Sequence, residues 1–104
     1  MGKDIVSING RFEWDEEKNI LNKKKHGLSF EDVIQIFDDP LFYEQLDEFH
    51  STDSEIRYIG MARLYGFTVI VSCYTERERV RLFSARVATS IEEKKYDEWC
   101  RQFI

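Results

Sequence analysis

Hydrophobic positions recur every three to four residues in the first part of the chain, a spacing that predicts helices. Phe30, Val33, Ile34 and Phe37 follow the i, i+3, i+4, i+7 pattern of a buried helix face. We expect this helix to end at the Asp-Asp-Pro sequence of residues 38–40, because the position before a proline disfavours helical geometry.

An earlier helix is predicted by the residues at its two ends. Asp15 is suited to cap the N-terminus, and Gly27 is suited to end the helix. The segment between them is polar, with only Ile20 and Leu21 clearly apolar, so we expect it to pack through a narrow stripe. Residues 11–14, just before it, predict a short strand.

The middle of the chain is rich in β-branched and aromatic residues, which favour strands. The predicted strands are residues 41–48, 56–64, 67–73 and 79–85. Short turns connect the last three, which indicates an antiparallel meander. Residues 69–71, Val-Ile-Val, do not alternate with polar residues, which indicates a central strand covered on both faces.

The last predicted strand has one apolar and one charged face. Val80 and Leu82 point one way, whereas Arg79, Arg81 and Phe83 point the other. We therefore expect one face of the sheet to carry helices and the other to carry a ring of arginines.

A final helix is predicted by the capping box that Thr89 and Glu92 form. Its apolar stripe is Tyr96, Trp99, Cys100 and Phe103. The predicted fold class is α+β: two N-terminal helices, a four- to five-stranded antiparallel sheet and a C-terminal helix.

Length and composition are those of one globular domain over residues 1–104. The chain is 42% hydrophobic and 34% charged with one proline, which excludes disordered and low-complexity classes. Its apolar runs are too short for a transmembrane helix or a signal peptide, and Cys73 and Cys100 form no disulfide framework. We expect a soluble, cytoplasmic, reduced protein that contacts no membrane.

Charge is distributed unevenly along the chain. Residues 1–53 carry 13 acidic and 6 basic side chains, whereas residues 54–104 carry 7 and 9. Most of the basic residues in the second half are arginines, whose planar group of donors suits phosphate. A mixed solvated surface would explain the pattern equally well, so the asymmetry is only an indication of an anionic partner.

Few residues offer recognisable chemistry. The two histidines and two cysteines lack the spacing of metal ligands, and no phosphate-binding loop or dinucleotide motif is present, so no metal or cofactor is expected. His26 suits general acid or base chemistry but also suits a helix end. Glu55 and Arg57 share one strand face and form either a site or a surface ion pair. An arginine inside a strand, such as Arg81, is either an edge residue or an anion ligand.

Taken together, these residues resemble the BrnT family, the toxin half of BrnT/BrnA type II toxin–antitoxin systems. The matching segments are Phe12-Glu13-Trp14-Asp15, Lys18, Asn22, Lys25-His26-Gly27, Ser29-Phe30-Glu31, Phe37-Asp38-Asp39-Pro40, Asp47-x-x-His50-Ser51, Glu55-x-Arg57, Gly60, Thr75-Glu76-Arg77, Arg81, Ser84-Ala85-Arg86, Ala88-Thr89, Glu92 and Tyr96. They cover residues 12–97 in order. Residues 1–10 precede the usual family start and are expected to add a strand or only a tail.

The resemblance implies a RelE-like fold and a ribonuclease that arrests growth. It also implies a BrnA-like ribbon-helix-helix antitoxin as partner, for which a heterotetramer is one arrangement. Contact with DNA would then be indirect, through an antitoxin that represses the operon. A non-catalytic module that holds the antitoxin is the alternative, and the acidic first half suits a basic partner. A small metabolic enzyme is a weaker third hypothesis.

Residue chemistry and the family match together suggest metal-independent attack of the RNA 2′-OH on its own phosphate. In this hypothesis Arg57, Arg81 and Arg86 hold the phosphate, and His26 or Glu55 is the base. The supporting residues are Lys25, for positive charge, and Tyr96, for a substrate or proton contact. We expect Arg81→Ala to abolish cleavage and leave the melting temperature nearly unchanged. Arg77 and His50 are interpreted as residues that fix local structure, with an RNA contact by His50 left open.

Overall fold

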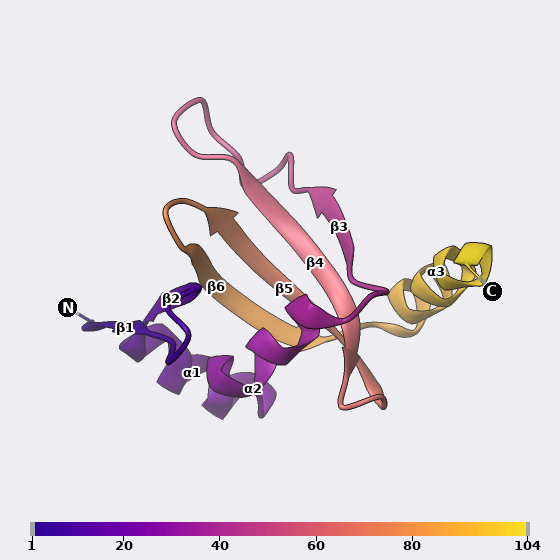
Figure 1. Cartoon of the computed structure of the whole chain (residues 1–104), viewed down its shortest axis with the longest axis horizontal. Coiled ribbons are helices and arrows are strands. Elements are labelled where there is room, and N and C mark those ends of the chain that lie inside the picture. Colours follow the sequence, from indigo (N-terminus) through magenta and orange to yellow (C-terminus); the bar gives the residue numbers. More distant parts are fainter. Residues whose placement is uncertain (1, 104) are drawn as a thin grey trace.

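A computed structural model describes residues 2–103 as one six-stranded sheet with helices on both faces (Figure 1). In chain order the elements are β1 (Asp4–Val6), β2 (Phe12–Asp15), α1 (Glu16–His26), α2 (Phe30–Val33), the 3-10 helix η1 (Ile34–Asp38), β3 (Tyr43–Leu46), β4 (Arg57–Leu64), β5 (Thr68–Glu76), β6 (Val80–Val87), α3 (Ser90–Cys100) and the 3-10 helix η2 (Arg101–Phe103). Strand order is β1-β2-β6-β5-β4-β3. No helix in this part of the chain is long and apolar enough to cross a membrane.

The α+β class is confirmed, but two details of the predicted sheet are wrong. The sheet has six strands rather than four or five, because β1 from the N-terminal segment joins it. It is mixed rather than antiparallel, since β2 pairs in parallel with β6. A parallel pair needs a crossover connection, and here that crossover contains α1, α2, η1 and three strands.

Both helix ends of α1 follow the sequence signals. The Asp15 carboxylate accepts hydrogen bonds from the backbone N–H of Glu17 and Lys18, and Gly27 ends the helix with a left-handed φ of 72°. The buried face differs from the prediction. Ile20 and Leu21 are exposed, and the buried α1 residues are Asn19 and Asn22.

The second predicted helix is shorter and tighter than expected. α2 covers only one turn, and the chain continues as η1 up to the predicted stop at Asp38. The change to 3-10 geometry alters the rotation per residue, so Ile36 is fully buried beside Phe30 and Val33 while Ile34 and Phe37 are half-buried.

The two sheet faces have separate cores, as the apolar run in β5 predicted. Ile70 and Leu82 pack with α2 and η1 on what we call the α2 face. Val69 and Val71 pack with Tyr96 of α3 on the opposite, α3 face. In Figure 1, α1 and α2 lie side by side along the sheet, and the yellow α3 lies at its far end. The prediction that only one face carries helices is therefore wrong: α3 covers part of the second face and leaves the rest open.

Candidate active site

A row of polar side chains crosses the open part of the α3 face. The strand register places Arg57 of β4 opposite Thr75 of β5, Thr75 opposite Arg81 of β6, and Arg81 opposite Glu13 of β2. Asp47, just beyond β3, extends the row because its N–H donates to the Arg57 carbonyl at 2.9 Å. We call these five residues the polar row. Neighbours across strands lie on the same face, so the fold brings polar side chains from five chain segments together, four of them charged.

Arg57 is held in place but keeps donors free. Its Nε donates to Glu55 at 3.1 Å, and its guanidinium lies over the ring of Phe83, 4.0 Å from the centroid. Phe83 occupies the irregular position between the pairs Cys73–Ser84 and Tyr74–Leu82, where β6 departs from regular register. Within residues 2–103 the two terminal nitrogens of Arg57 have no hydrogen-bond partner, so they are available for an anion.

Glu55 joins two arginines. Its second carboxylate oxygen accepts from Arg77 at 2.6 Å, while the first accepts from Arg57. The Arg77 hydrogen bond is the main cause that lowers the pKa of Glu55, with Arg57 adding to it. A carboxylate held in this way is a poor proton acceptor near neutral pH, so the geometry favours a positioning role for Glu55 over the role of base.

The other two predicted phosphate ligands are already paired. Arg81 is only 15% exposed and donates to Glu13 and, at 3.0 Å, to Asp4 of β1. Arg86 donates to both carboxylate oxygens of Glu92, at 2.7 and 2.9 Å. These pairs neutralise most of the positive charge that the sequence predicted for this face.

A histidine stands at the end of the polar row. The ring Nδ1 of His50 lies 2.8 Å from the carboxylate of Asp47, which is 4% exposed, while His50 itself is open to solvent. The carboxylate favours the tautomer with hydrogen on Nδ1, which leaves Nε2 as a proton acceptor. Ser51 ties this loop to β4, because its hydroxyl accepts from Arg57 N–H at 2.8 Å and donates to the Asp47 carbonyl.

The remaining predicted site residues lie elsewhere. His26, at the end of α1, borders a hollow with Leu64 and Phe67 near the β4–β5 turn, at the opposite end of β4 from Arg57. Lys25 precedes it on the helix surface. Tyr96 is buried and its hydroxyl donates to the Leu41 carbonyl at 2.8 Å, a contact that fastens α3 to the chain before β3.

Sequence reasoning assigned Arg77 and Phe83 no part in the site, and for His50 it left only a contact with RNA open. The Asp47-x-x-His50 spacing was visible, but it also fits an ordinary turn, since Asp47 also accepts from His50 N–H. Only the fold shows that Asp47 is buried beside Arg57. Cys73 lies in the same region, and burial raises the pKa of its thiol, so a thiolate nucleophile is not favoured.

No three His, Cys, Asp or Glu side chains within residues 2–103 gather in a way that would hold a metal ion. The polar row and the adjacent His50 together offer cationic donors, a histidine with a free ring nitrogen and a carboxylate that orients it. Such a set can bind an anion and move a proton.

Comparison with known proteins identifies the family of the chain. The family model described as ribonuclease toxin, BrnT, of type II toxin–antitoxin system matches residues 14–92. No curated protein matches the chain. Among solved structures, the crystal structure of the Brucella abortus ribonuclease toxin BrnT matches with a TM-score of 0.56 and 25% identity, covering 74% of this chain and 94% of that chain. Because the family model spans most of the sequence, the chain belongs to the BrnT family of ribonuclease toxins of type II toxin–antitoxin systems.

Proposed function

We propose that the protein is a metal-independent ribonuclease that cleaves RNA by attack of a 2′-OH on the adjacent phosphate. The family supplies the activity class and implies an antitoxin partner. The mechanism rests on one observation. The buried Asp47 carboxylate hydrogen-bonds the ring of His50, and the pair lies next to the free donors of Arg57 on the same sheet face.

In this mechanism His50 transfers protons and Arg57 stabilises the charge on the phosphate. Nε2 of neutral His50 accepts the 2′-OH proton, and the 2′-oxygen then forms a bond to phosphorus. The bond to the 5′-oxygen breaks, and protonated imidazole or water supplies the proton that this leaving group needs. Arg57 stabilises the charge on the phosphate oxygens as it develops, and Asp47 stabilises the imidazolium.

The other charged residues support these two. Glu55 fixes the Arg57 guanidinium and brings Arg77 beside it. Arg81 and Arg86 can bind an RNA phosphate only if the phosphate displaces the carboxylates that are paired with them, so they contribute less than Arg57. His26 and Lys25 take no part in this mechanism, although the sequence suggested them.

The antitoxin is proposed to be a BrnA-like ribbon-helix-helix protein that blocks this face and represses the operon, in a complex for which a heterotetramer is one arrangement. The alternative is a toxin fold that only binds the antitoxin and cuts no RNA. The pairing of Arg81 with Glu13 and Asp4 favours this alternative, because it lowers the positive charge of the face.

The two histidines of the chain provide the test. Antitoxin-free protein is incubated with end-labelled RNA in EDTA, beside His50→Gln, His26→Gln and Arg57→Ala. We expect cleavage by wild type and His26→Gln, and a loss of roughly 10²–10⁴-fold in His50→Gln. Arg57→Ala should lose a similar amount, because one preorganised donor to the developing charge is worth about 10²–10³-fold.

Each result assigns a role. If His26→Gln is inactive and His50→Gln is active, the base is His26 and the mechanism above is wrong. If folded wild-type protein cuts no RNA, alone or with ribosomes, the antitoxin-binding module is favoured. A 2′,3′-cyclic phosphate on the product, detected by mass spectrometry, is the expected sign of 2′-OH attack.

A further inference from the structure

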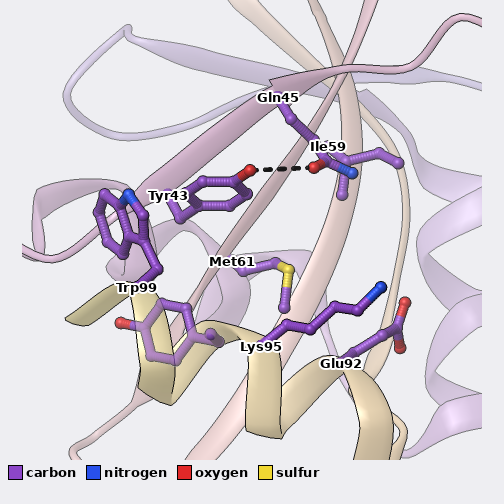
Figure 2. A pocket seen from close by; sticks show the side chains of 8 residues that line it. Tyr43, Gln45, Ile59, Met61, Glu92, Lys95 and Trp99 are labelled. Atoms are coloured by element: carbon purple, nitrogen blue, oxygen red, sulfur yellow. Dashed lines mark hydrogen bonds between the residues drawn. The ribbon is translucent and has the colours of Figure 1, made fainter. Parts of the chain in front are cut away.

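We propose that a pocket beside the polar row, between β3, β4 and α3, holds one nucleobase of the RNA (Figure 2). We call it the α3 pocket. The proposal rests on the proposed ribonuclease function and adds a subsite to it. Its helical wall, with Lys95, Tyr96 and Trp99, lies beyond residue 92, where the family match ends.

The size and walls of the α3 pocket suit a flat aromatic group. Its volume is about 280 Å³, just below the range of drug-sized ligand pockets, which is roughly 300–1,000 Å³, and so fits a small flat group. Tyr43 and Trp99 meet edge to face, with centroids 4.9 Å apart and planes at 66°. Met61 also lines the pocket and lies between Tyr43 and Lys95 in Figure 2. Aromatic and thioether walls of this kind stack on bases of any sequence.

One polar group in the α3 pocket can recognise the edge of a base. The Tyr43 hydroxyl donates to the Gln45 carboxamide oxygen at 3.1 Å, which fixes the orientation of that amide. The amide NH₂ of Gln45 has no partner within residues 2–103, and its oxygen keeps a second acceptor site. A base edge offers matching donors and acceptors, whereas an aliphatic side chain of a protein partner would leave this amide unpaired.

The α3 pocket lies next to the proposed phosphate site. Ile59 lines it and lies two residues from Arg57 on the same strand face, a distance of about 7 Å along β4. On the other side of the pocket, Glu92 is a lining residue and accepts a hydrogen bond from Arg86. Lys95 extends from α3 beside Glu92 (Figure 2). Arg57 therefore stands on one side of the pocket and Lys95 on the other, so a base can enter while its neighbouring phosphate lies on the free donors of Arg57.

Tryptophan fluorescence gives a direct test, because Trp14 is 1% exposed and Trp99 lines the pocket. A 2′-fluoro RNA oligonucleotide, which lacks the attacking hydroxyl, is titrated into wild-type protein. Binding is followed by anisotropy of a label on the oligonucleotide and by quenching of tryptophan emission. We expect both signals to saturate together, and we expect Trp99→Phe to lose the quenching and keep the anisotropy change.

Two variants measure how much Trp99 and Gln45 contribute to oligonucleotide binding. Trp99→Ala should weaken binding by roughly 5- to 150-fold, the range for loss of one base stack. Gln45→Ala should weaken binding of the preferred base by roughly 2- to 10-fold and reduce the differences among homopolymers. Gln35→Ala, an exposed glutamine of η1 on the other side of the molecule, is the matched control and should bind as wild type does.

The outcomes separate this proposal from the proposed function. Oligonucleotide binding without quenching, and with Gln45→Ala equal to Gln35→Ala, would overturn the base pocket and leave the ribonuclease mechanism intact. Quenching by the antitoxin but by no oligonucleotide would assign the α3 pocket to a protein partner and overturn the proposal. Absence of both oligonucleotide binding and RNA cleavage would overturn the pocket and the ribonuclease together.

Discussion

Asn22 closes an open sheet edge with one side chain. β2 stops pairing with β6 at Leu82, so within residues 2–103 the next residues of β6 have no neighbouring strand on that side. The Asn22 carboxamide oxygen accepts from Ala85 N–H at 3.0 Å, and its NH₂ group donates to the Leu28 carbonyl at 3.0 Å. One residue thus satisfies two backbone groups and holds α1 against the sheet.

This role of Asn22 predicts that losing a polar side chain of α1 costs more stability than losing an apolar one. Asn22→Ala leaves a donor and an acceptor without partners, so we expect a loss of about 2–4 kcal/mol in the free energy of unfolding. Leu21→Ala, at a neighbouring position that is 63% exposed, should cost less than about 0.5 kcal/mol. Urea unfolding of both variants checks this, and a larger loss in Leu21→Ala would contradict it.

The pair of Glu92 and Arg86 makes stability depend on pH. Hydrogen bonds from Arg86 lower the pKa of Glu92 to about 2. A carboxyl with a depressed folded-state pKa contributes stability above its unfolded value, near 4.5, and loses that contribution as pH falls toward 2. Because both side chains are partly exposed, we expect about 1 kcal/mol from the pair.

Glu92→Gln tests this because glutamine can still complete the capping box with Thr89. The variant should be less stable than wild type at pH 7, and the difference should shrink between about pH 5 and pH 2. Thermal unfolding across that range measures it. A constant difference would mean that the cap, and not the ion pair, is responsible.

At the scale of elements, β4 depends on a glycine at its centre. A Cβ at Gly60 would collide with the ring of Phe42 and come within 2.9 Å of Tyr74 Cε1. Both rings belong to the aromatic cluster on the α2 face, where Phe37 lies 4.8 Å from Phe42 and 4.9 Å from Tyr74, measured between centroids. The cluster packs η1 directly on the backbone of β4.

Gly60→Ala should therefore destabilise the protein by about 1–3 kcal/mol through overpacking. The double variant Gly60→Ala/Phe42→Leu should recover part of this loss, because the smaller side chain makes room for the methyl group. Unfolding of the single and double variants in denaturant measures the coupling. Strictly additive losses would show that the clash with Phe42 is not the cause.

For the whole molecule, the N-terminal strand connects the edge of the sheet to the polar row. Asp4 of β1 and Glu13 of β2 both accept from Arg81, which lowers the pKa of Asp4. Arg81 is therefore part of an ion-pair network across three strands. The expectation that Arg81→Ala leaves the melting temperature unchanged no longer follows, and a loss of activity in that variant would mix stability with chemistry.

Removal of residues 1–6 separates the two effects. We expect the melting temperature to fall by about 5–10 °C, since β1 pairing and one Arg81 contact are lost. Cleavage per folded molecule should persist, because His50, Arg57 and the α3 pocket remain. Asp4→Asn isolates the ion-pair part of the loss. A truncated protein that is folded but inactive would place β1 in the active site.

The sequence by itself determined the ends of α1, the start of α3, most of the strands and the family. Caps and stops at Asp15, Gly27 and Thr89, and the apolar run of β5, are local signals, because they depend on backbone groups a few residues away. The ordered motifs likewise identified the BrnT family, which the family model confirmed. The sequence also placed Glu55 with Arg57, and Arg79 with Arg81, on one face of their strands, but only the pairing of β4, β5 and β6 brings Arg57 and Arg81 to the same face of the sheet.

Only the tertiary structure decided which charges are free and which histidine stands beside the arginines. The pairing of Arg81 with Asp4 spans 77 residues, and the parallel contact of β2 with β6 spans most of the chain, so no local pattern encodes them. Asp47 and Asn22 are polar residues that the fold buries because each meets specific backbone or side-chain partners. The Asn22–Ala85 hydrogen bond joins residues 63 positions apart. Asp47 meets His50 locally, but only the pairing of its segment with β4 brings both residues beside Arg57.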